Sequence, residues 1–315
     1  LVVIIDYTII ILGGMNMNAV NIHNVTKRYQ KVTALDHVSF TLEHGKIYGF
    51  LGRNGAGKST LINILANRIF ADEGEIFIDG LPAAENMAVQ EKIFCMSEAD
   101  LYDTSLRVRE LFRWTDRFYD SFDLERALNI AERFGLDTRK KFRALSKGYQ
   151  SIFKLTVALA LDVPYVVFDE PVLGLDANHR ELFYELLLNN YEEHPRTIVI
   201  ATHLIEEVAN LIEEVVLIDH GRILLEDSVE HLLETGYCVS GISEDVEEFC
   251  RDRKVIGEDT LGGMKLAYVM GERPRTVPGR NLQITGMNLQ KLFVKLTEDA
   301  DRKTGGSAEK RGQKE

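Results

Sequence analysis

The chain has 315 residues, enough for one large domain and a small one. Hydrophobic residues make up 45% and charged residues 27%, the composition of an ordinary soluble globular protein. The formal net charge of −12 argues against a general nucleic-acid-binding surface, because phosphate backbones attract basic patches. The three cysteines, Cys95, Cys238 and Cys250, lack metal-type spacing, so we expect isolated thiols in a reducing cytoplasm.

The first twelve residues, LVVIIDYTIIIL, are apolar but too few to span a bilayer, and they include Asp6. They also lack the basic start and the small-residue cleavage site of a signal peptide. Because methionines stand at positions 15 and 17, we expect residues 1–16 to be an upstream, non-native extension. An amphipathic anchor is the alternative. The rest of the sequence has no run of 18 apolar residues and predicts no membrane-spanning helix.

Strand and helix signals alternate along most of the chain. Strands are predicted at Val20–Gln30, Ala34–Leu42, Lys46–Leu51, Gly74–Asp79, Tyr165–Phe168, Thr197–Ala201 and Val215–Ile218. A helix is predicted from Lys58 to Ile69, and helices replace strands between about Ser105 and Phe142. This alternation predicts an α/β fold with a largely parallel, helix-covered sheet.

The character of the sequence changes after about Thr235. Residues 236–298 contain two short strand-like pieces, KLAYVM and NLQITG, and a final helical stretch, LQKLFVKLT. We expect this segment to form a small separate α+β appendage. Residues 299–315 are polar, with many Lys, Arg and Glu and a Gly-Gly-Ser stretch, and are expected to be a disordered tail.

The segment GRNGAGKST, from Gly52 to Thr60, has the spacing of a phosphate-binding loop between a predicted strand and a predicted helix. Glycines let the backbone wrap closely around phosphate oxygens, and the following helix N-terminus favours anions. We expect Lys58 to reach the β- and γ-phosphates of ATP and the Ser59 hydroxyl to ligate Mg²⁺. The residues expected to contact the nucleotide here are Gly52, Asn54, Gly55, Gly57, Lys58, Ser59 and Thr60.

A pair of carboxylates stands further along the chain, where the apolar run Tyr165–Phe168 leads into Asp169 and Glu170. A buried strand that ends in two acids beside a nucleotide suits phosphoryl transfer. Asp169 would hold Mg²⁺, and Glu170 would position and polarise the attacking water. Asp-Glu pairs are common on solvated surfaces, so this motif gains its meaning from the phosphate loop upstream.

Three further motifs accompany these two. LSKGYQ at 145–150 precedes the Asp-Glu strand, GLD at 174–176 follows it, and His203 stands just after the strand TIVIA. Taken in order, the five motifs resemble the ATP-binding cassette (ABC) family: phosphate loop, LSGGQ signature, Asp-Glu pair, D-loop and switch histidine. The resemblance covers roughly residues 18–235 and implies a P-loop ATPase with a mostly parallel core sheet, an antiparallel β subdomain and a helical signature subdomain.

The resemblance implies roles for five more residues. Ser146 and Gly148 would contact the γ-phosphate of an ATP held by the opposite subunit, a task that a helix N-terminus suits. His203 would hydrogen-bond that phosphate or the attacking water, and Asp176 would couple the two sites of a dimer. Tyr29 matches the family's aromatic residue that stacks on adenine.

Two departures from the family pattern concern the signature and the Q-loop. Lys147 replaces the first signature glycine and Tyr149 replaces the glutamine. The usual Q-loop glutamine is aligned with Glu98, which we expect to ligate Mg²⁺ or its water while adding negative charge near the triphosphate.

Residues 99–145 correspond to the family's helical subdomain. Arginines and aromatic residues alternate there, which is typical of a helical core with solvated charges; a nucleic-acid surface is the alternative. In a transporter this surface would receive coupling helices of a membrane partner. The stretches LFRWTDRFYDSFD and FGLDTRKKFRALSKG look most like the YtrB-like branch of bacterial exporter ATPases.

The resemblance therefore implies an ABC ATP-binding domain at 17–235, followed by the 236–298 appendage. We expect an ATPase that binds ATP and Mg²⁺, pairs with a second ABC cassette, and powers integral-membrane permease subunits from the cytoplasmic face of the membrane. Export is the expected direction, and no nucleic-acid partner is expected. A soluble ABC ATPase acting on the ribosome or DNA is the alternative.

Overall fold

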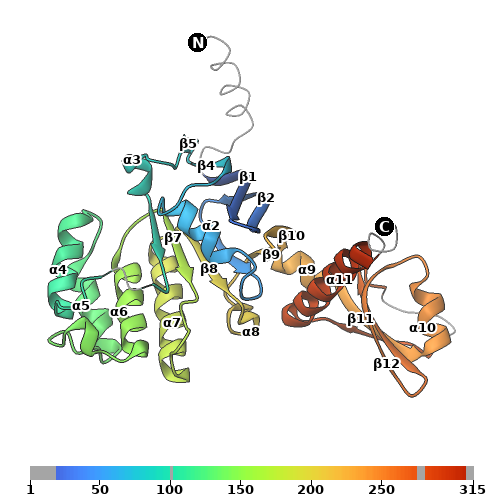
Figure 1. Ribbon diagram of the computed structural model, residues 1–315. Helices are drawn as coiled ribbons and strands as arrows, with labels where there is room; N and C mark the ends of the chain where they lie inside the picture. The colour runs from blue at the N-terminus through green and yellow to red at the C-terminus, as the bar shows by residue number, and fades with distance from the viewer. Residues whose placement is uncertain (1–18, 100–101, 275–280, 310–315) are drawn as a thin grey trace, which may run out of the picture.

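The computed structural model describes residues 19–99, 102–274 and 281–309, with side chains described as far as Asp301 (Figure 1). The expectations for residues 1–16 and for the last six residues therefore lie outside the described part. Within that part, none of the helices combines the length and the apolar character that a bilayer crossing requires.

The N-terminal part forms an antiparallel sheet. Its strands are β1 (Ala19–Tyr29), β2 (Val32–Glu43), β4 (Glu73–Ile78) and β5 (Leu81–Pro82), in the order β2-β1-β4-β5. Val20 faces Leu42 across one side of β1 and Ile78 across the other, which places apolar residues of three strands in one core.

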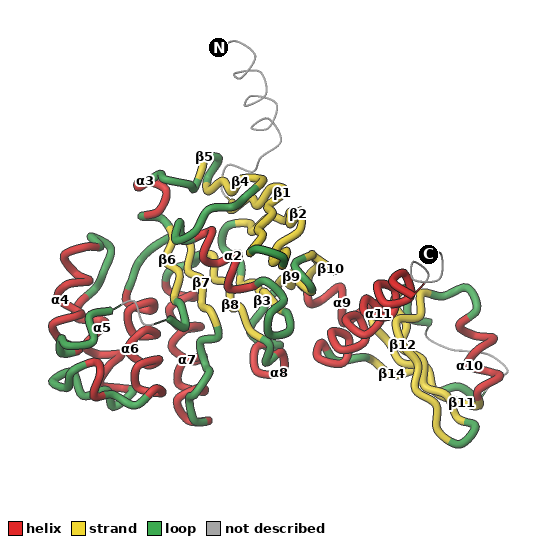
Figure 2. The backbone as a smooth tube through the Cα atoms, viewed as in Figure 1, coloured by secondary structure: helices red, strands yellow, loops and turns green. Residues whose placement is uncertain are grey.

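A six-stranded sheet forms the centre of the molecule (Figure 2). Its strands are β3 (Ile47–Leu51), β6 (Ile93–Met96), β7 (Tyr165–Asp169), β8 (Thr197–Thr202), β9 (Glu214–Asp219) and β10 (Arg222–Ser228), in the order β10-β9-β3-β8-β7-β6. All neighbours are parallel except β9 and β10. Every residue of β3, β7 and β8 is buried, as expected for strands with both faces covered. The predicted α/β fold with a mostly parallel core sheet is confirmed.

Helices cover this sheet and form a bundle beside it. They are α2 (Lys58–Leu65), α3 (Met87–Gln90), α4 (Val108–Phe118), α5 (Leu124–Arg133), α6 (Lys147–Ala160), α7 (Ala177–Glu193), α8 (Ile205–Val208) and α9 (Val229–Thr235). The prediction that the first helix runs to Ile69 is wrong. It ends at Leu65 because the backbone reverses at Asn67, whose φ is 53°, and Arg68 turns to donate to the Cys95 carbonyl.

Aromatic side chains hold α4 and α6 together. The Phe112 ring stacks on the Phe153 ring with centroids 5.3 Å apart, and Phe142 meets Phe153 edge-on at the same distance. All three side chains are fully buried. This contact fixes the helical region against α6, which begins in the LSKGYQ motif.

We expect Phe153→Ala to destabilise the protein by about 3–5 kcal/mol, because it leaves a cavity between the Phe112 and Phe142 rings. Thermal unfolding should show this as a fall in Tm of roughly 10 °C. Phe118→Ala is the matched control, since Phe118 is 76% exposed and its loss removes little buried area. Equal Tm values for the two variants would contradict this packing.

The C-terminal part forms a second, smaller antiparallel sheet with two helices (Figure 1). Its elements are β11 (Gly236–Ile242), α10 (Ser243–Cys250), β12 (Lys254–Leu261), β13 (Met264–Met270), β14 (Gln283–Gly286) and α11 (Leu289–Glu309), with strand order β12-β13-β11-β14. One face of the sheet buries Val239, Val246 and Phe249 in a small core of its own. The other face, with Leu292 and Phe293 of α11, joins the main core.

The tail differs from the sequence expectation. Residues 299–309 continue α11 as helix instead of being disordered, and the Asp301 side chain accepts a hydrogen bond from Arg53. Extending a helix whose first turns are already packed adds one backbone hydrogen bond per residue without a new nucleation cost, which favours this continuation.

Candidate functional site

The loop from Gly52 to Thr60 joins the end of β3 to the start of α2. Gly55 and Gly57 have φ of 80° and 112°, in the left-handed region that side chains disfavour. A Cβ on Gly57 would also lie 2.6 Å from the Ala34 carbonyl oxygen, and one on Gly52 would lie 2.6 Å from that of Ile218. The glycines are thus required by the backbone path, which wraps tightly ahead of the helix N-terminus.

The Lys58 ammonium lies inside this loop. It donates to the carbonyls of Gly52 (2.6 Å) and Arg53 (3.3 Å) and stands 3.6 Å from a carboxylate oxygen of Glu170. Burial lowers the pKa of Lys58, while Glu170 and Asp169 counteract that effect. One buried cation therefore stands among loop carbonyls and two carboxylates, where it can bind an anionic ligand.

The hydroxyl of Ser59 donates to the Asp169 carboxylate over 3.3 Å, so the two predicted magnesium ligands are adjacent. Burial raises the pKa of Asp169, and the neighbouring charges of Glu170 and Glu98 raise it further. Burial and these neighbouring charges disfavour the ionised form of Asp169, and a bound cation would offset that effect. The hydroxyl and the carboxylate are both oxygen donors, the kind of ligand that Mg²⁺ prefers.

Glu170 follows directly after β7, with a φ of 47° that is unusual for a residue other than glycine. One carboxylate oxygen lies 2.9 Å from the His203 Nδ1, and the other accepts a hydrogen bond from the Thr202 hydroxyl at 2.9 Å. The parallel register of β7 and β8, which pairs Asp169 with Ala201, brings these side chains together. The result is a fixed carboxylate–imidazole pair beside Lys58.

The signature motif lies at the start of α6. Ser146 caps this helix and accepts a hydrogen bond from the Tyr149 backbone at 3.3 Å. Gly148 packs so closely that a Cβ there would lie 2.9 Å from the Gly174 carbonyl oxygen. In the described part of the chain, no hydrogen bond or ion pair joins Ser146 or Gly148 to the phosphate loop of the same chain.

The family model described as ABC transporter matches residues 35–173. The petrobactin import ATP-binding protein YclP of Bacillus subtilis is 31% identical over 226 residues, which cover 69% of this chain and 89% of that protein. The chain belongs to the ABC transporter family. It is accordingly an ATPase built on a nucleotide-binding cassette.

Other relatives extend the comparison. YtrB of Bacillus subtilis is 29% identical over 61% of this chain, which spans 66% of that relative's length. The Nod factor export ATP-binding protein I of Burkholderia orbicola is 28% identical over 90% of this chain and 98% of its own length. A dimeric structure of the cassette MJ0796, in a post-hydrolysis state with ADP and Pi, superposes with a TM-score of 0.61 at 25% identity, covering 67% of this chain and 98% of that one.

Asp176 lies at the N-cap of α7. Its carboxylate accepts a hydrogen bond from the His179 backbone N–H and lies 2.9 Å from that residue's imidazole. The structure therefore places this D-loop residue beside the signature helix, since the Tyr149 ring also packs edge-on against His179. Its role across a dimer stays a prediction.

The positions of two other predicted cassette residues, Tyr29 and Glu98, are less closely tied to the loop. Tyr29 ends β1 and is 46% exposed, with the Lys27 ammonium 5.7 Å from the centre of its ring. Glu98 is exposed, and its backbone carbonyl accepts a hydrogen bond from Lys154 of α6 at 2.6 Å. The structure thus ties the Q-loop position to the signature helix.

Sequence reasoning missed Thr202 and Lys154. Thr202 is the last residue of β8 and orients Glu170, while Lys154 joins the Q-loop backbone to α6. Thr202 precedes His203 directly, which was the available signal. Nothing about Lys154 in the sequence distinguishes it from a solvated lysine, and only the fold reveals that it is buried.

Proposed function

We propose that this chain is the ATP-hydrolysing subunit of a bacterial ABC exporter, bound at the cytoplasmic face of the membrane to separate permease subunits. Two cassettes would close around two ATP molecules and pull on the membrane partner, and hydrolysis would release them.

The proposal of a membrane partner rests on a mostly apolar groove of about 800 Å³ between α3 and α4. Two of its side chains, Met87 and Phe118, are 80% and 76% exposed. The groove is lined by Met87, Gln90, Glu91, Tyr102, Asp103, Leu106, Leu111, Trp114, Thr115, Phe118 and Tyr119. Exposed aromatic and methionine side chains around a groove suit the apolar face of a short helix.

The proposal of export rests on how much of this chain each relative aligns with. The Nod factor export proteins of three Burkholderia species align over 90% of this chain, which includes much of its C-terminal part. The petrobactin import relative aligns over 69%. Both are transporter subunits, so the alternative of an ATPase acting on the ribosome or DNA is not favoured.

Pairing with a second cassette is supported by the position of the signature. Ser146 and Gly148 form no hydrogen bond or ion pair with the phosphate loop of their own chain among the described residues, as expected if they complete the site of another cassette. The dimeric MJ0796 structures provide a precedent at 25% identity. A homodimer and a heterodimer both satisfy this requirement.

Within each site the chain's own residues divide the work. Lys58 would bind the β- and γ-phosphates, and Ser59 and Asp169 would hold Mg²⁺, with Glu98 nearby. When bound, the ion would neutralise charge on the phosphates. Glu170 would orient the attacking water and accept its proton, while His203 holds that carboxylate in place.

We expect Phe118→Asp to abolish co-purification with the permease while leaving the ATPase rate of the isolated chain within about twofold of wild type. A charge in the groove would have to be desolvated against an apolar helix, which weakens binding. Detergent extraction of a tagged chain, followed by identification of the bound membrane proteins, measures this directly.

Leu128→Asp is the control, because Leu128 is 44% exposed on α5 and does not line the groove. A permease that stays bound to the Phe118 variant, or is lost from both variants, would count against the groove as its docking site. Soluble ribosomal or DNA-bound partners in place of a permease would overturn the proposed function.

A further inference from the structure

The last helix of the C-terminal part reaches the phosphate loop. Arg53, the second residue of that loop, donates one hydrogen bond to the Asp301 carboxylate at 2.8 Å and another to the Thr297 hydroxyl at 3.2 Å. Both partners lie on α11, more than 240 residues away along the chain. The contact joins a helix outside the cassette motifs to the loop expected to bind phosphate.

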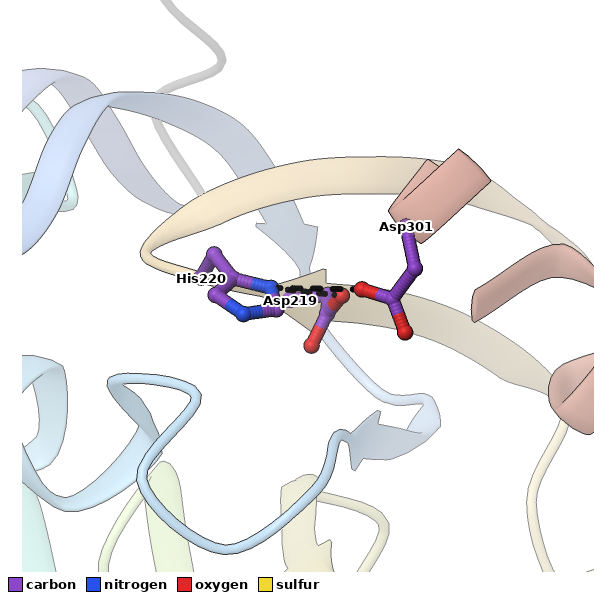
Figure 3. A group of neighbouring side chains, drawn as sticks. All are labelled: Asp219, His220 and Asp301. Carbon is purple, nitrogen blue, oxygen red and sulfur yellow. Dashed lines mark hydrogen bonds and ion pairs between the residues drawn. The ribbon is translucent and has the colours of Figure 1, made fainter. Parts of the chain in front are cut away.

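The turn between β9 and β10 also lies next to Asp301. The His220 Nδ1, in the turn between β9 and β10, lies 2.9 Å from Asp219 and 4.0 Å from Asp301 (Figure 3). The three side chains each offer one ligand-type atom within 4.8 Å of the others, and His220 is 75% exposed. Two carboxylates therefore lie beside the phosphate loop, where they oppose the attraction of an anionic nucleotide.

The body of α11 is firmly held, so Asp301 has a fixed base. Leu292 and Phe293 are buried in the main core, and Thr297 is 1% exposed. With its amide nitrogen oriented toward α8, Gln290 donates to the Glu206 carboxylate at 2.5 Å. Helix α8 begins two residues after His203, so α11 contacts both the phosphate loop and the helix that follows His203.

The phosphate loop does not depend on α11 for its order. Its glycines are packed against the backbones of Ala34 and Ile218, and the Ala56 carbonyl accepts a hydrogen bond from the Gly221 N–H at 2.9 Å. The Arg53 and Asp301 side chains are 45% and 42% exposed, which limits what their ion pair adds to stability. The main effect of Asp301 on this loop is therefore electrostatic.

We propose that α11 acts as a brake on the nucleotide site: Asp301 holds the Arg53 guanidinium and its negative charge lowers the affinity of the phosphate loop for ATP. This inference rests on the proposed nucleotide-binding role of that loop. The phosphates of a bound ATP compete with Asp301 for Arg53, so binding at the loop loosens the end of α11. By linkage, the factor by which bound ATP weakens the Arg53–Asp301 contact equals the factor by which loss of that contact raises the affinity for ATP.

The first test uses the full chain with Asp301→Asn, which removes the charge and keeps the size of the side chain. At low ionic strength we expect MgATP to bind about two- to fivefold more tightly, the range of a partly exposed charge pair. The KM for ATP should fall by a similar factor while kcat stays unchanged. Asp301→Glu keeps the charge and should bind ATP like wild type.

Glu247→Gln is the matched control, because Glu247 forms an exposed ion pair with Lys265 within the same C-terminal part. Its ATP affinity should equal that of wild type. Unchanged or weaker binding by Asp301→Asn would overturn the brake but leave the nucleotide site standing. A wild-type chain that bound no ATP would overturn the proposed function as well.

Hydrogen exchange on the unaltered chain tests the reciprocal effect. We expect MgATP to speed amide exchange at the turn of α11 around Thr297 to Asp301, and to leave β13 unchanged. A purely structural contact would show no change there, and slower exchange would mean that nucleotide tightens the contact. Either result would overturn the proposal.

Discussion

Glu170→Gln is expected to reduce ATP turnover by about 10²–10⁴-fold, the usual contribution of a positioned general base. Glutamine keeps the acceptor for the Thr202 hydroxyl but removes the charge that lies 2.9 Å from the His203 imidazole. The fold and the ATP-binding residues remain in place, so the variant should accumulate as an ATP-bound dimer. Phosphate release measures turnover, and light scattering with and without MgATP measures the mass.

Glu185→Gln provides the control for this change, since Glu185 forms an exposed ion pair with Arg133 away from the loop. That variant should hydrolyse ATP like wild type and show no extra dimer. Rapid hydrolysis by the Glu170 variant would remove this residue from the catalytic role. A variant that hydrolyses ATP slowly but stays monomeric with ATP would support the role of Glu170 in hydrolysis and contradict the proposed closure of an ATP-bound dimer.

Lys58→Ala is expected to weaken ATP binding by at least about 30-fold, because truncating a buried charged partner costs roughly 2–5 kcal/mol. Its ammonium is the cation that stands between the loop carbonyls and Glu170 at 3.6 Å. Without it, the repulsion of the triphosphate by Asp169 and Glu170 loses its nearest compensating charge. Calorimetric titration with MgATP gives the affinity.

Lys92→Ala is the matched control, since Lys92 pairs with Asp79 at 2.7 Å and does not contact the phosphate loop. It should bind ATP normally. Tight ATP binding by the Lys58 variant would contradict the assigned role of the loop lysine. A loss of binding with an unchanged melting temperature would show that Lys58 serves the ligand and not the fold.

The parallel core was predictable because its strands are short and mostly apolar. Tyr165–Phe168 and Thr197–Ala201 have this pattern, and the structure places them as adjacent strands. The strand β10 was missed because its residues alternate between exposed and half-buried positions and it includes charged side chains. Local periodicity detects a buried strand more readily than an edge strand.

The end of the first helix could not be predicted from the local sequence pattern either. Ile62, Ile64, Leu65 and Ile69 continue an apolar series, yet the helix ends at Leu65. Arg68 instead reaches across to the carbonyl of Cys95, which lies in another strand of the fold. The spacing of apolar residues within one segment gives no information about a contact with a residue so far away in the sequence.

By itself, the sequence determined the α/β fold class and the chemistry of the phosphate loop. Glycines at 52, 55 and 57 and the Lys58-Ser59 pair are local requirements of a backbone that wraps an anion, so the pattern states them directly. It also determined the order of the motifs from the loop to His203, which carried the family resemblance.

Only the tertiary structure decided which side chains meet. The 2.9 Å contact of Glu170 with His203 follows from the register of β7 and β8, and the contact of Arg53 with Asp301 follows from the docking of α11. Both depend on packing between segments far apart in the chain. Hydrophobic burial sets that packing, and it is a property of the whole folded core rather than of any one segment.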